Sequence, residues 1–374
     1  MKTITLSANS SWYLYNFRSS TIIEAINRGY EVTCLSPTDD YTQSLVSLGC
    51  KHYPINFISK NSNPFSEFLL IFKFFFAYQK IKPMIAFHFT VKNNIYGTIA
   101  AASMGIPAVS NISGLGTAFI KKSLISNVVL FLYKVSQRFA FKIFCQNEED
   151  LNFLINNKIS SKGKLILIPG SGVDTNRFHP NLRENYHSSI SNNNKFTFLY
   201  AGRMLYDKGL NELLEAFQAL NKHESISELV LCGFVDSDNI SAISNHELQS
   251  WSKISGVEWV GSSNNIEIIM AKADCIVLPS YREGMPKTLL EAGSMGLPAI
   301  ATNVPGCRNI ITDNFNGILC EPYSSTSLKH AMEKIIRLDK NKLSTMGNNA
   351  RSRVLEKFDE TIVIKNFFQV IDQL

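Results

Sequence analysis

Two glutamates eight residues apart, Glu283 and Glu291, are the residues of this sequence whose types and spacing best indicate chemistry. They are the first and last residues of the run Glu-Gly-Met-Pro-Lys-Thr-Leu-Leu-Glu, which comes shortly after an apolar segment ending in proline. The apolar segment is typical of a buried strand, and Pro286 suits the first turn of a helix because its missing N–H is not needed there. Glu283 is therefore predicted in a loop and Glu291 on a helix.

The start of this helix could hold an anion. The backbone N–H groups from Lys287 to Leu289 are expected to lack intrahelical acceptors at the positive end of the helix, where they could bind phosphate or sugar oxygens. The two carboxylates could then accept hydrogen bonds from hydroxyl groups. This combination favours a sugar-nucleotide site, and the alternative is a loop carboxylate with an unrelated, solvated helix residue.

A second loop could supply positive charge. Ala201 ends a predicted strand, and Gly202, Arg203 and Lys208 follow it before a helix period starts. A glycine lets the backbone approach a ligand closely, an arginine binds phosphate oxygens through two parallel hydrogen bonds, and a lysine adds a mobile charge. The pair could neutralise a diphosphate leaving group without a metal, although such a pair on a loop is often plain surface.

The elements that must position these loops follow an α/β pattern. Short apolar runs alternate with helix-period segments throughout the 374 residues, and the chain is longer than one domain usually is. One series of predicted strands lies between residues 4 and 146, and a second begins at Phe196. We predict two doubly wound domains that face a central cleft, with ligands beyond the carboxyl ends of the strands.

Composition suggests where the domains begin and end. Residues 1–175 form the predicted first domain, and a polar, low-complexity stretch marks a linker at 176–195. Residues 196–358 form the second domain. The last segment, 359–374, has more apolar residues than one free helix face needs, so we expect it to pack back across the seam onto the first domain.

Several kinds of chemistry have no support in the sequence. No G-x-G-x-x-G follows the first predicted strand and no P-loop motif is present, which argues against a dinucleotide cofactor and P-loop ATP chemistry. The seven cysteines form no C-x-x-C pair, and we interpret them as reduced, buried thiols. The sequence Asp-Ser-Asp at 236–238 imitates a metal-binding D-x-D but is interpreted as a solvated loop, so neither metal nor cofactor is expected.

The first half of the chain is basic. Residues 1–180 contain 18 Lys and Arg against 9 Asp and Glu. The apolar stretch 68–78 is far shorter than the roughly 20 residues of a spanning helix. The stretch 68–78 is surrounded by lysines, and a second apolar helix flanked by lysines is expected at about 119–141. Both could lie on an anionic membrane surface; the alternative is that they are ordinary core helices.

The sequence has no basic run interleaved with aromatic residues, so nothing indicates binding of nucleic acid. No signal peptide precedes the first strand, so we expect a cytoplasmic protein.

Together these motifs resemble the retaining GT-B glycosyltransferases of the family 4 type, over essentially the whole chain and most specifically in the second domain. The resemblance implies that Arg203 and Lys208 hold the donor diphosphate, that Glu283 contacts the donor hexose and that Glu291 takes the ribose hydroxyls. Gly202 would belong to the diphosphate loop, and Gly261 to the loop that holds the base. The amides expected to meet sugar and phosphate oxygens are those of Gly284, Met285, Lys287, Thr288 and Leu289.

The first domain is similar to that of bacterial members that add sugars to lipid-linked precursors of surface polysaccharides. The matching segments are 15–18, 90–97 and 111–117. They make Asn16, Lys92, Asn94 and Gly116 the candidates on the acceptor side, although Lys92 and Asn94 could instead shape a turn.

Two departures limit the likeness of the first domain. Relatives often carry glycines in the first loop, where this chain has Asn9 and Ser10, and some have a histidine where Val91 stands. His88 is therefore interpreted as a structural residue at the end of a strand.

The resemblance implies transfer of a hexose or N-acetylhexosamine from a nucleotide diphosphate sugar, with UDP favoured, to a polyprenyl-diphosphate-linked saccharide. The anomeric configuration would be kept, and the reaction would serve O-antigen, lipopolysaccharide, capsule or similar bacterial glycan assembly at the inner face of the plasma membrane. The alternatives are an epimerase of UDP-sugars with the same architecture, a polysaccharide synthase of the starch type, and a non-catalytic protein that only binds sugar nucleotides.

Overall fold

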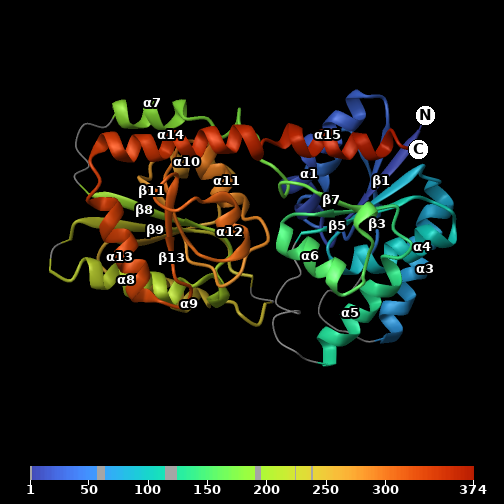
Figure 1. Ribbon diagram of the computed structural model, residues 1–374, viewed down its shortest axis with the longest axis horizontal. Coiled ribbons are helices and arrows are strands. Elements are labelled where there is room, and N and C mark those ends of the chain that lie inside the picture. Colours follow the sequence, from blue (N-terminus) through green and yellow to red (C-terminus); the bar gives the residue numbers. More distant parts are fainter. Residues whose placement is uncertain (1, 57–63, 114–123, 190–194, 224, 237–238) are drawn as a thin grey trace. The chain divides into compact units, whose positions relative to one another are not determined.

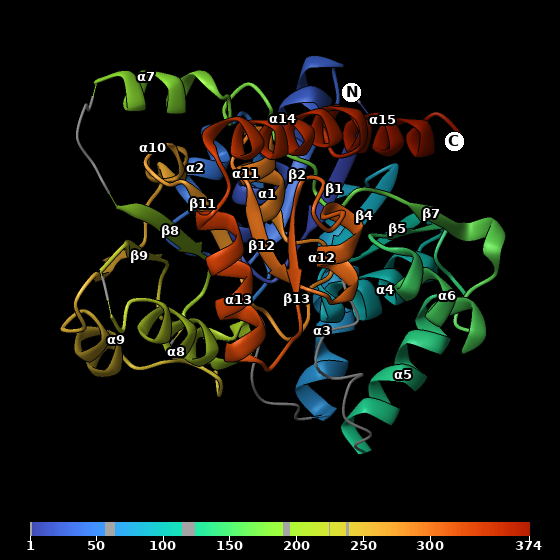
Figure 2. The same ribbon diagram turned by 60° about the vertical axis from the view of Figure 1, so that its left-hand side comes forward.

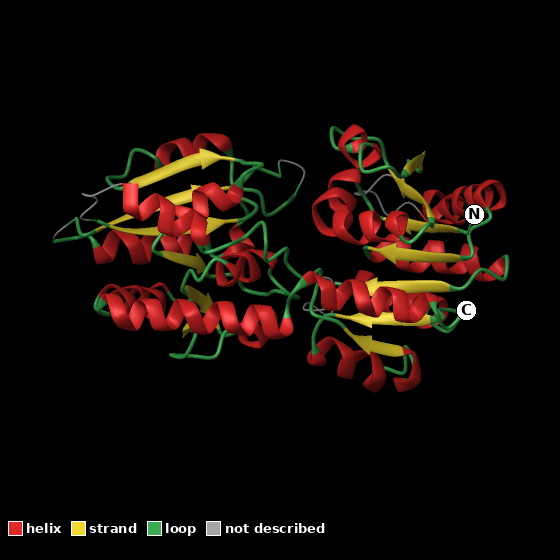
Figure 3. Ribbon diagram, turned by 90° about the horizontal axis from the view of Figure 1, so that it is seen from above, coloured by secondary structure: helices red, strands yellow, loops and turns green. Residues whose placement is uncertain are grey.

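A computed structural model describes residues 2–374 except 57–63, 114–123, 190–194, 224 and 237–238 (Figure 1). The chain divides into two compact units. Unit 1 comprises residues 1–171 and 361–374, and unit 2 comprises residues 172–360. Each unit is a parallel sheet with helices on both of its faces, as Figure 3 shows. The prediction of two doubly wound α/β domains is confirmed.

The sheet of unit 1 has seven strands in the order β3-β2-β1-β4-β5-β6-β7. Their bounds are β1 Thr3–Ser7, β2 Glu31–Ser36, β3 Lys51–Pro54, β4 Ile85–Phe89, β5 Ala108–Ile112, β6 Lys142–Cys145 and β7 Leu165–Leu167. The central strands are buried on both faces, which is why they read as short apolar runs rather than as alternating patterns. The strand order reverses between β1 and β4, and this is the switch point of unit 1.

The helices of unit 1 cover both faces of this sheet. They are α1 Ser11–Asn27, α2 Thr42–Val46, α3 Pro64–Ile81, α4 Thr98–Ser103, α5 Leu124–Ser136 and α6 Glu148–Asn156, together with the π-helical turn η1 Asn93–Gly97 and the short turn η3 Lys162–Lys164. Ser10 is the N-cap of helix α1, and its hydroxyl accepts a hydrogen bond from the Tyr13 N–H at 3.1 Å. In the described part of the chain, no helix combines the length and the apolar composition that crossing a bilayer requires.

The C-terminal helix α15 (Glu360–Ile371) packs on unit 1, as predicted. Its apolar side chains join the core beneath α1, and the ring of Phe367 stacks on Phe87 of β4 with centroids 3.8 Å apart. This burial explains why the segment carries more apolar residues than a free helix needs. The last residues of the chain therefore complete the first unit.

Unit 2 has six parallel strands in the order β10-β9-β8-β11-β12-β13. The strands are β8 Phe196–Ala201, β9 Ser227–Cys232, β10 Val257–Gly261, β11 Cys275–Leu278, β12 Ala299–Thr302 and β13 Gly317–Cys320. The helical elements are α7 Asn181–Ser189, η4 Tyr206–Lys208, α8 Leu210–Leu220, α9 Asn245–Trp251, α10 Ile266–Ala271, α11 Lys287–Ser294, α12 Pro305–Ile310, α13 Ser325–Ile336 and α14 Lys340–Lys357. Helices α8 and α13 lie side by side against this sheet in Figures 1 and 2.

The segment predicted as a linker, 176–195, differs from that expectation where the structure describes it. It contains α7, and Phe178 before this helix is a buried member of the unit 2 core. Arg183 of α7 donates to the carbonyl oxygens of Gly296 and Ala273 at 2.7 and 3.3 Å. The polar composition of the segment thus conceals the apolar anchors Phe178 and Leu182 and a half-buried arginine that fix it to unit 2.

His88 is a structural residue, as expected. It lies in β4 with no exposed surface, and its Nδ1 is 2.7 Å from the Ser7 hydroxyl. Burial lowers the pKa of His88 to about 3, so the imidazole stays neutral. Gly97 of η1 packs directly against the ring, where a Cβ atom would come within 2.4 Å of it. All seven cysteines are buried and free, which confirms their interpretation as reduced thiols.

Candidate functional site

The strand order of unit 2 reverses between β8 and β11, which are neighbours in the sheet. The loops that leave the carboxyl ends of these two strands therefore meet. Lys208 comes from the loop after β8 and Glu283 from the loop after β11, and the lysine Nζ lies 2.7 Å from Oε1 of the glutamate. Their side chains are 17% and 13% exposed. The two predicted loops converge at the place where open α/β sheets bind ligands.

A glycine makes this junction possible. Gly209 precedes α8 in the left-handed conformation, with φ of 70°. A Cβ atom at Gly209 would lie 2.1 Å from the carbonyl oxygen of Pro279, at the end of β11. The Tyr281 N–H also donates to the carbonyl of Asp207 at 3.0 Å. Because the two loops touch backbone to backbone, Lys208 is held beside Glu283.

Arg203 lies near the surface of the same unit and forms an ion pair with Asp236, which the sequence did not predict. Its Nη1 is 3.3 Å from Oδ2 of Asp236, and the arginine side chain is 45% exposed. Asp236 lies in a loop, as expected, and its side chain is 28% exposed. Its ion pair with Arg203 forms because the loop after β9 lies next to the loop after β8. Ser237 and Asp238 lie outside the described residues. The Tyr200 hydroxyl donates to the Arg203 carbonyl at 2.8 Å and Gly202 packs over that hydroxyl, so the start of the loop is fixed.

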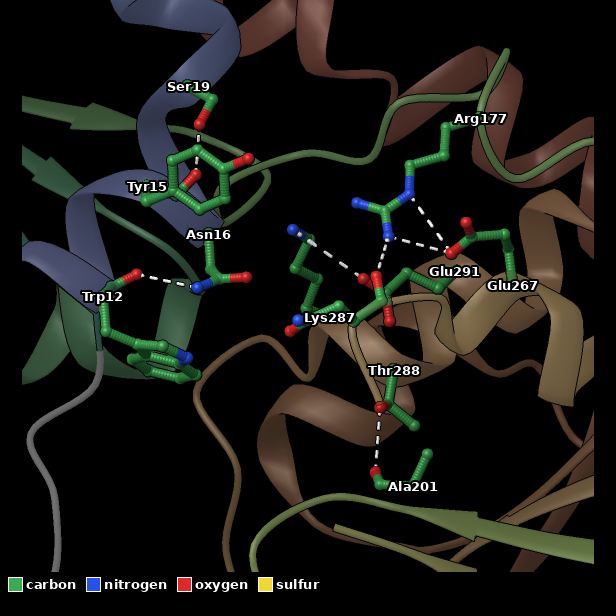
Figure 4. A network of polar contacts seen from close by, with 11 residues as sticks. Trp12, Tyr15, Asn16, Ser19, Arg177, Ala201, Glu267, Lys287, Thr288 and Glu291 are labelled. Atoms are coloured by element: carbon green, nitrogen blue, oxygen red, sulfur yellow. Dashed lines mark hydrogen bonds and ion pairs between the residues drawn. The ribbon is translucent and has the colours of Figure 1, made fainter. Parts of the chain in front are cut away.

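Helix α11 begins at the predicted position, with Pro286 as its N-cap. The Thr288 hydroxyl donates to the carbonyl of Ala201, the last residue of β8, at 2.9 Å (Figure 4). The N–H of Leu289 donates to the Pro286 carbonyl at 3.1 Å, so this amide is not the orphan donor that was expected. A tight first turn supplies the acceptor. Met285 packs against the core of unit 2, which anchors the turn between Glu283 and α11.

Glu291 is not a solvated helix residue. It is only 8% exposed, and its Oε1 lies 3.7 Å from Nζ of Lys287, one turn earlier on α11. Burial raises the pKa of the Glu291 carboxyl, the nearby charges of Lys287 and Arg177 oppose that shift, and Glu267 adds to it. A buried carboxylate with a lysine over it can accept hydrogen bonds from hydroxyl groups.

Arg177 is a site residue that sequence reasoning missed. Its Nη2 lies 2.8 Å from a carboxylate oxygen of Glu267 and donates to the Asn264 carbonyl at 2.9 Å. Figure 4 shows Arg177, Glu267 and Glu291 grouped together. No signal in the sequence distinguishes this arginine, because it stands in the segment predicted as a linker and meets its partners only through the fold.

Gly261 ends β10 with φ of 71°, and a Cβ atom there would meet nothing within 4 Å. The residue is therefore needed for its backbone conformation rather than for space. Its carbonyl accepts the N–H of Gly233, and Asn264, three residues later, is the residue that Arg177 holds. The loop after β10 is thus tied to the surroundings of Glu291.

The acceptor-side candidates in unit 1 have internal partners. Lys92 forms an ion pair with Glu67 of α3 at 2.5 Å, and the Asn16 amide donates to the Trp12 carbonyl at 2.9 Å. Asn94 is 1% exposed and donates to the Asn111 carbonyl at 2.9 Å, which supports its alternative role of shaping the turn after β4. Gly116 lies outside the described residues.

Comparison with protein families decides what kind of protein has this site. Residues 183–353 match the family model described as "Glycosyl transferases group 1", and residues 3–147 match the one described as "Glycosyl transferase 4-like". The two ranges together span most of the chain. The chain belongs to the GT-B glycosyltransferases of the family 4 type.

Two relatives of this glycosyltransferase are bacterial enzymes. It is 27% identical to the N,N'-diacetylbacillosaminyl-diphospho-undecaprenol alpha-1,3-N-acetylgalactosaminyltransferase of Campylobacter jejuni, with 96% of each chain covered. It is 26% identical to the UDP-Gal:alpha-D-GlcNAc-diphosphoundecaprenol alpha-1,3-galactosyltransferase of Escherichia coli, with 72% of this chain and 70% of the relative covered.

Solved structures share the fold. HepE of Anabaena in complex with UDP superposes with a TM-score of 0.80 at 18% identity, and all of both chains is covered. WaaG, a glycosyltransferase of lipopolysaccharide biosynthesis, superposes with a TM-score of 0.72 at 16% identity, and the match covers 97% of this chain and 98% of WaaG.

Within the described residues of this glycosyltransferase, no three His, Cys, Asp or Glu side chains gather closely enough to hold a metal ion.

Proposed function

We propose that this glycosyltransferase moves a hexose or N-acetylhexosamine from a UDP-sugar to an undecaprenyl-diphosphate-linked saccharide, with retention of the anomeric configuration and without a metal. The observation that carries the proposal is the 2.7 Å contact between Lys208 and Glu283 at the switch point of unit 2, with Arg203 on the same loop as Lys208. A cation for the leaving diphosphate and a carboxylate for the hexose are adjacent there.

The chemistry requires charge to be stabilised in two places. When the diphosphate leaves, negative charge grows on its oxygens while the sugar ring becomes an oxocarbenium-like cation. Arg203, Lys208 and the start of α11 are suited to the negative charge, and Glu283 is suited to the hexose hydroxyls or to the developing cation. Without donor, Asp236 and Glu283 hold the two cations in place, so an arriving diphosphate meets positive charge that is already oriented.

This assignment needs no separate acid–base pair. In a front-side route the leaving phosphate accepts the proton of the acceptor hydroxyl as the new glycosidic bond forms. Two cations and a helix N-terminus also supply the charge that a metal would otherwise contribute. We therefore expect transfer to persist in the presence of a chelator.

The nature of the acceptor is inferred from the relatives. The names of both enzymes above specify an acceptor linked to undecaprenyl diphosphate, and the first of them aligns with 96% of this chain. We extend that acceptor class to this protein. Its place in the cell would then be the inner face of the plasma membrane, where O-antigen, capsule or similar glycans are assembled.

The surface of unit 1 suits such a place. Helices α3 and α5 pack on the same core around η1, yet both leave large apolar side chains exposed. These are Phe68, Leu69, Phe72 and Phe76 on α3 and Val128, Phe131 and Phe139 on or just after α5. We call these seven residues the aromatic patch. Lys73, Lys80 and Lys134 on the same helices add positive charge, so an anionic lipid surface is the partner that we propose.

Arg203→Ala and Lys208→Ala test the catalytic assignment. Each removes a charge-assisted contact worth on the order of 2–4 kcal/mol of transition-state stabilisation, so transfer should fall by roughly two to three decades while the fold is kept. Lys329→Ala is the matched control, because Lys329 pairs with Glu333 on α13 of the same unit. The measurement is kcat/KM for transfer to a lipid-linked acceptor. Near-normal turnover in either site variant would refute the assignment.

The same assay separates the rival functions. An epimerase would convert a UDP-sugar when no acceptor is present, and a non-catalytic binder would bind UDP-sugars without consuming them when acceptor is supplied. A polysaccharide synthase of the starch type would extend a free glucan and ignore the lipid-linked acceptor. Our proposal expects consumption of donor only in the presence of the lipid-linked acceptor.

A further inference from the structure

Unit 1 has a switch point of its own, and a buried arginine lies there. The strand order reverses between β1 and β4. Arg18 is on α1, the helix that follows β1, and it faces the core with only 3% of its surface exposed. Its guanidinium carbon lies 4.4 Å from the ring centroid of Phe89, the last residue of β4. A positive charge is thus buried at the carboxyl ends of the central strands.

The guanidinium is only partly satisfied. Within the described residues, Nε and Nη2 of Arg18 are both buried and have no hydrogen-bond partner. These two nitrogens form the side edge of the guanidinium, whose parallel N–H groups match two oxygens of one phosphate or carboxylate. The ring of Phe89 offsets part of the cost of burial by a cation–π contact but accepts no conventional hydrogen bond. The edge that lacks partners is the edge that binds oxyanions.

A second donor without a partner lies on the neighbouring strand. Asn111 of β5 pairs in register with Phe89, so the two side chains point to the same face of the sheet. Asn111 is 2% exposed, and its Nδ2 has no partner in the described part of the chain. Its Oδ1 accepts a hydrogen bond from the Gln146 amide at 3.3 Å. Buried hydrogen-bond donors from α1 and from β5 therefore both lie beside Phe89.

Such an arrangement is costly without a ligand. Buried charges and buried amide donors are normally paired, because water that solvated them in the unfolded chain is lost. Two buried, unsatisfied donor groups on one face of a sheet, at a switch point, indicate a site that an anion completes. A structural arginine would instead have carboxylate or carbonyl partners in the fold, as Arg177 does through Glu267 and the Asn264 carbonyl.

We propose that Arg18 and Asn111 form an oxyanion site in unit 1 that binds the diphosphate of the lipid-linked acceptor. This inference rests on the proposed function for the identity of the ligand, since the diphosphate is the anionic group that every acceptor of that class carries. The site is separate from the residues that hold the donor in unit 2. It assigns binding of the acceptor to the unit that carries the aromatic patch.

The test measures binding without turnover. Farnesyl diphosphate and inorganic pyrophosphate are titrated into the full-length protein in the presence of saturating UDP, which occupies the donor site. Farnesyl diphosphate should bind to the wild type. Arg18→Met keeps the length of the side chain but removes its charge and donors, and should weaken this binding roughly tenfold to a hundredfold. The KM for acceptor should rise by a similar factor, and the affinity for UDP should not change.

Two further variants keep the test decisive. Asn111→Asp places a carboxylate beside the guanidinium, so it should block farnesyl diphosphate binding while raising the melting temperature of the ligand-free protein. Arg28→Met is the control for Arg18→Met, because Arg28 is an exposed arginine at the end of the same helix. Arg28→Met should bind the probe like the wild type.

Several results would overturn the inference. Unchanged farnesyl diphosphate binding in Arg18→Met or in Asn111→Asp would do so, as would a wild type that binds inorganic pyrophosphate but not the prenyl form. Failure of the proposed function looks different: Arg18-dependent binding of farnesyl diphosphate would remain, but no sugar would be transferred. Normal transfer with an Arg18→Met variant indistinguishable from the wild type would reject the oxyanion site alone.

Discussion

The Glu291 carboxylate occupies a place that is unfavourable for a charge. It is 8% exposed, and the charge of Lys287 offsets only part of the cost of its burial. The pKa of Glu291 is therefore raised above the ordinary 4.5. Since the carboxyl binds its proton more tightly in the folded than in the unfolded chain, its ionisation costs stability as the pH rises through the folded-state pKa. A ligand hydroxyl that bonds to the carboxylate would recover part of that cost.

Glu291→Gln should separate the effect on binding from the effect on stability. The loss of a hydrogen bond to a charged group should raise the KM for UDP-sugar roughly tenfold to a hundredfold at pH 7. The melting temperature at pH 7 should be equal to or above that of the wild type, because the buried charge is gone. For the wild type, the donor KM should rise on acidification at a pH above 4.5, and for the variant it should be flat there.

Glu333→Gln is the control for this prediction. Glu333 is a glutamate on α13 whose pKa is lowered by its hydrogen bond to Lys329. Its pKa is therefore shifted in the opposite direction to that of Glu291. The control should leave the donor KM and its pH dependence as they are. A Glu291→Gln enzyme that keeps the pH dependence of the wild type would show that another group titrates.

The sequence predicted the positions of those side chains that lie directly after a strand or at the start of a helix, because such positions depend on local pattern. Lys208 and Glu283 each follow a recognisable strand, and both positions were predicted correctly. The ion pairs of Arg177 and Asp236 were not predicted, because each residue approaches its partner from a segment whose own pattern is polar and irregular. The Leu289 amide was misjudged because its acceptor, the Pro286 carbonyl, depends on how tightly the first turn closes.

Helix α12 (Pro305–Ile310) supports the loop that carries Glu283. The Gly306 N–H donates to the Glu283 carbonyl at 3.2 Å. A Cβ atom at Gly306 would lie 2.5 Å from the Gly284 carbonyl oxygen and 2.8 Å from that of Glu283. These are backbone atoms, so neither can turn away as a flexible side chain would. The position of the acidic loop thus depends on the absence of one methyl group.

Gly306→Ala should therefore act on catalysis from outside the site. Either α12 or the loop must shift, and a displacement of about 1 Å at a reacting group can cost on the order of a hundredfold in rate. We expect kcat/KM to fall at least roughly tenfold, with weaker UDP-sugar binding. Gly163→Ala is the control, since a Cβ atom there would meet nothing within 4 Å. If the Gly306 variant matches the control in kinetics and melting temperature, the loop is free to move and the prediction is wrong.

The elements themselves were largely predictable, whereas their order in the sheets was not. Strands buried on both faces read as apolar runs, and Pro286 marked the start of α11. The meeting of the Lys208 and Glu283 loops requires β8 and β11 to be neighbours, which depends on the reversal of strand order rather than on periodicity. The packing of the segment 176–195 was missed because only a few of its residues, Phe178 and Leu182 among them, contact the core.

Positive charge and exposed apolar side chains are unevenly distributed between the two halves of the chain. The chain has a net charge of +6, yet residues 1–180 contain twice as many basic as acidic residues. The same part of the chain bears the aromatic patch and the buried Arg18. Unit 2 instead holds the ion pairs Arg203–Asp236 and Lys208–Glu283, which form the proposed donor site. Under the proposed function the two units would divide the substrates, with the donor on unit 2 and the lipid-linked acceptor on unit 1.

This division predicts that unit 1 alone determines membrane binding. A fully buried Phe side chain contributes about 1.5–3 kcal/mol, so replacing two exposed ones should weaken binding to anionic vesicles at least roughly tenfold. Phe76→Ser with Phe131→Ser is the informative variant, because these side chains are 59% and 64% exposed and come from α3 and α5. Phe315→Ser is the control, since Phe315 is 52% exposed in unit 2.

Sedimentation with vesicles of phosphatidylglycerol and phosphatidylcholine measures the effect. Binding should weaken with salt and with the fraction of neutral lipid, because lysines near an anionic surface contribute about 1 kcal/mol each. The double variant should still transfer sugar to a short, water-soluble acceptor at the wild-type rate, since the aromatic patch is on the outer surface of α3 and α5. Equal vesicle binding by the double variant and the Phe315→Ser control would show that the aromatic patch does not bind the membrane. Such a result would not bear on the proposed donor site.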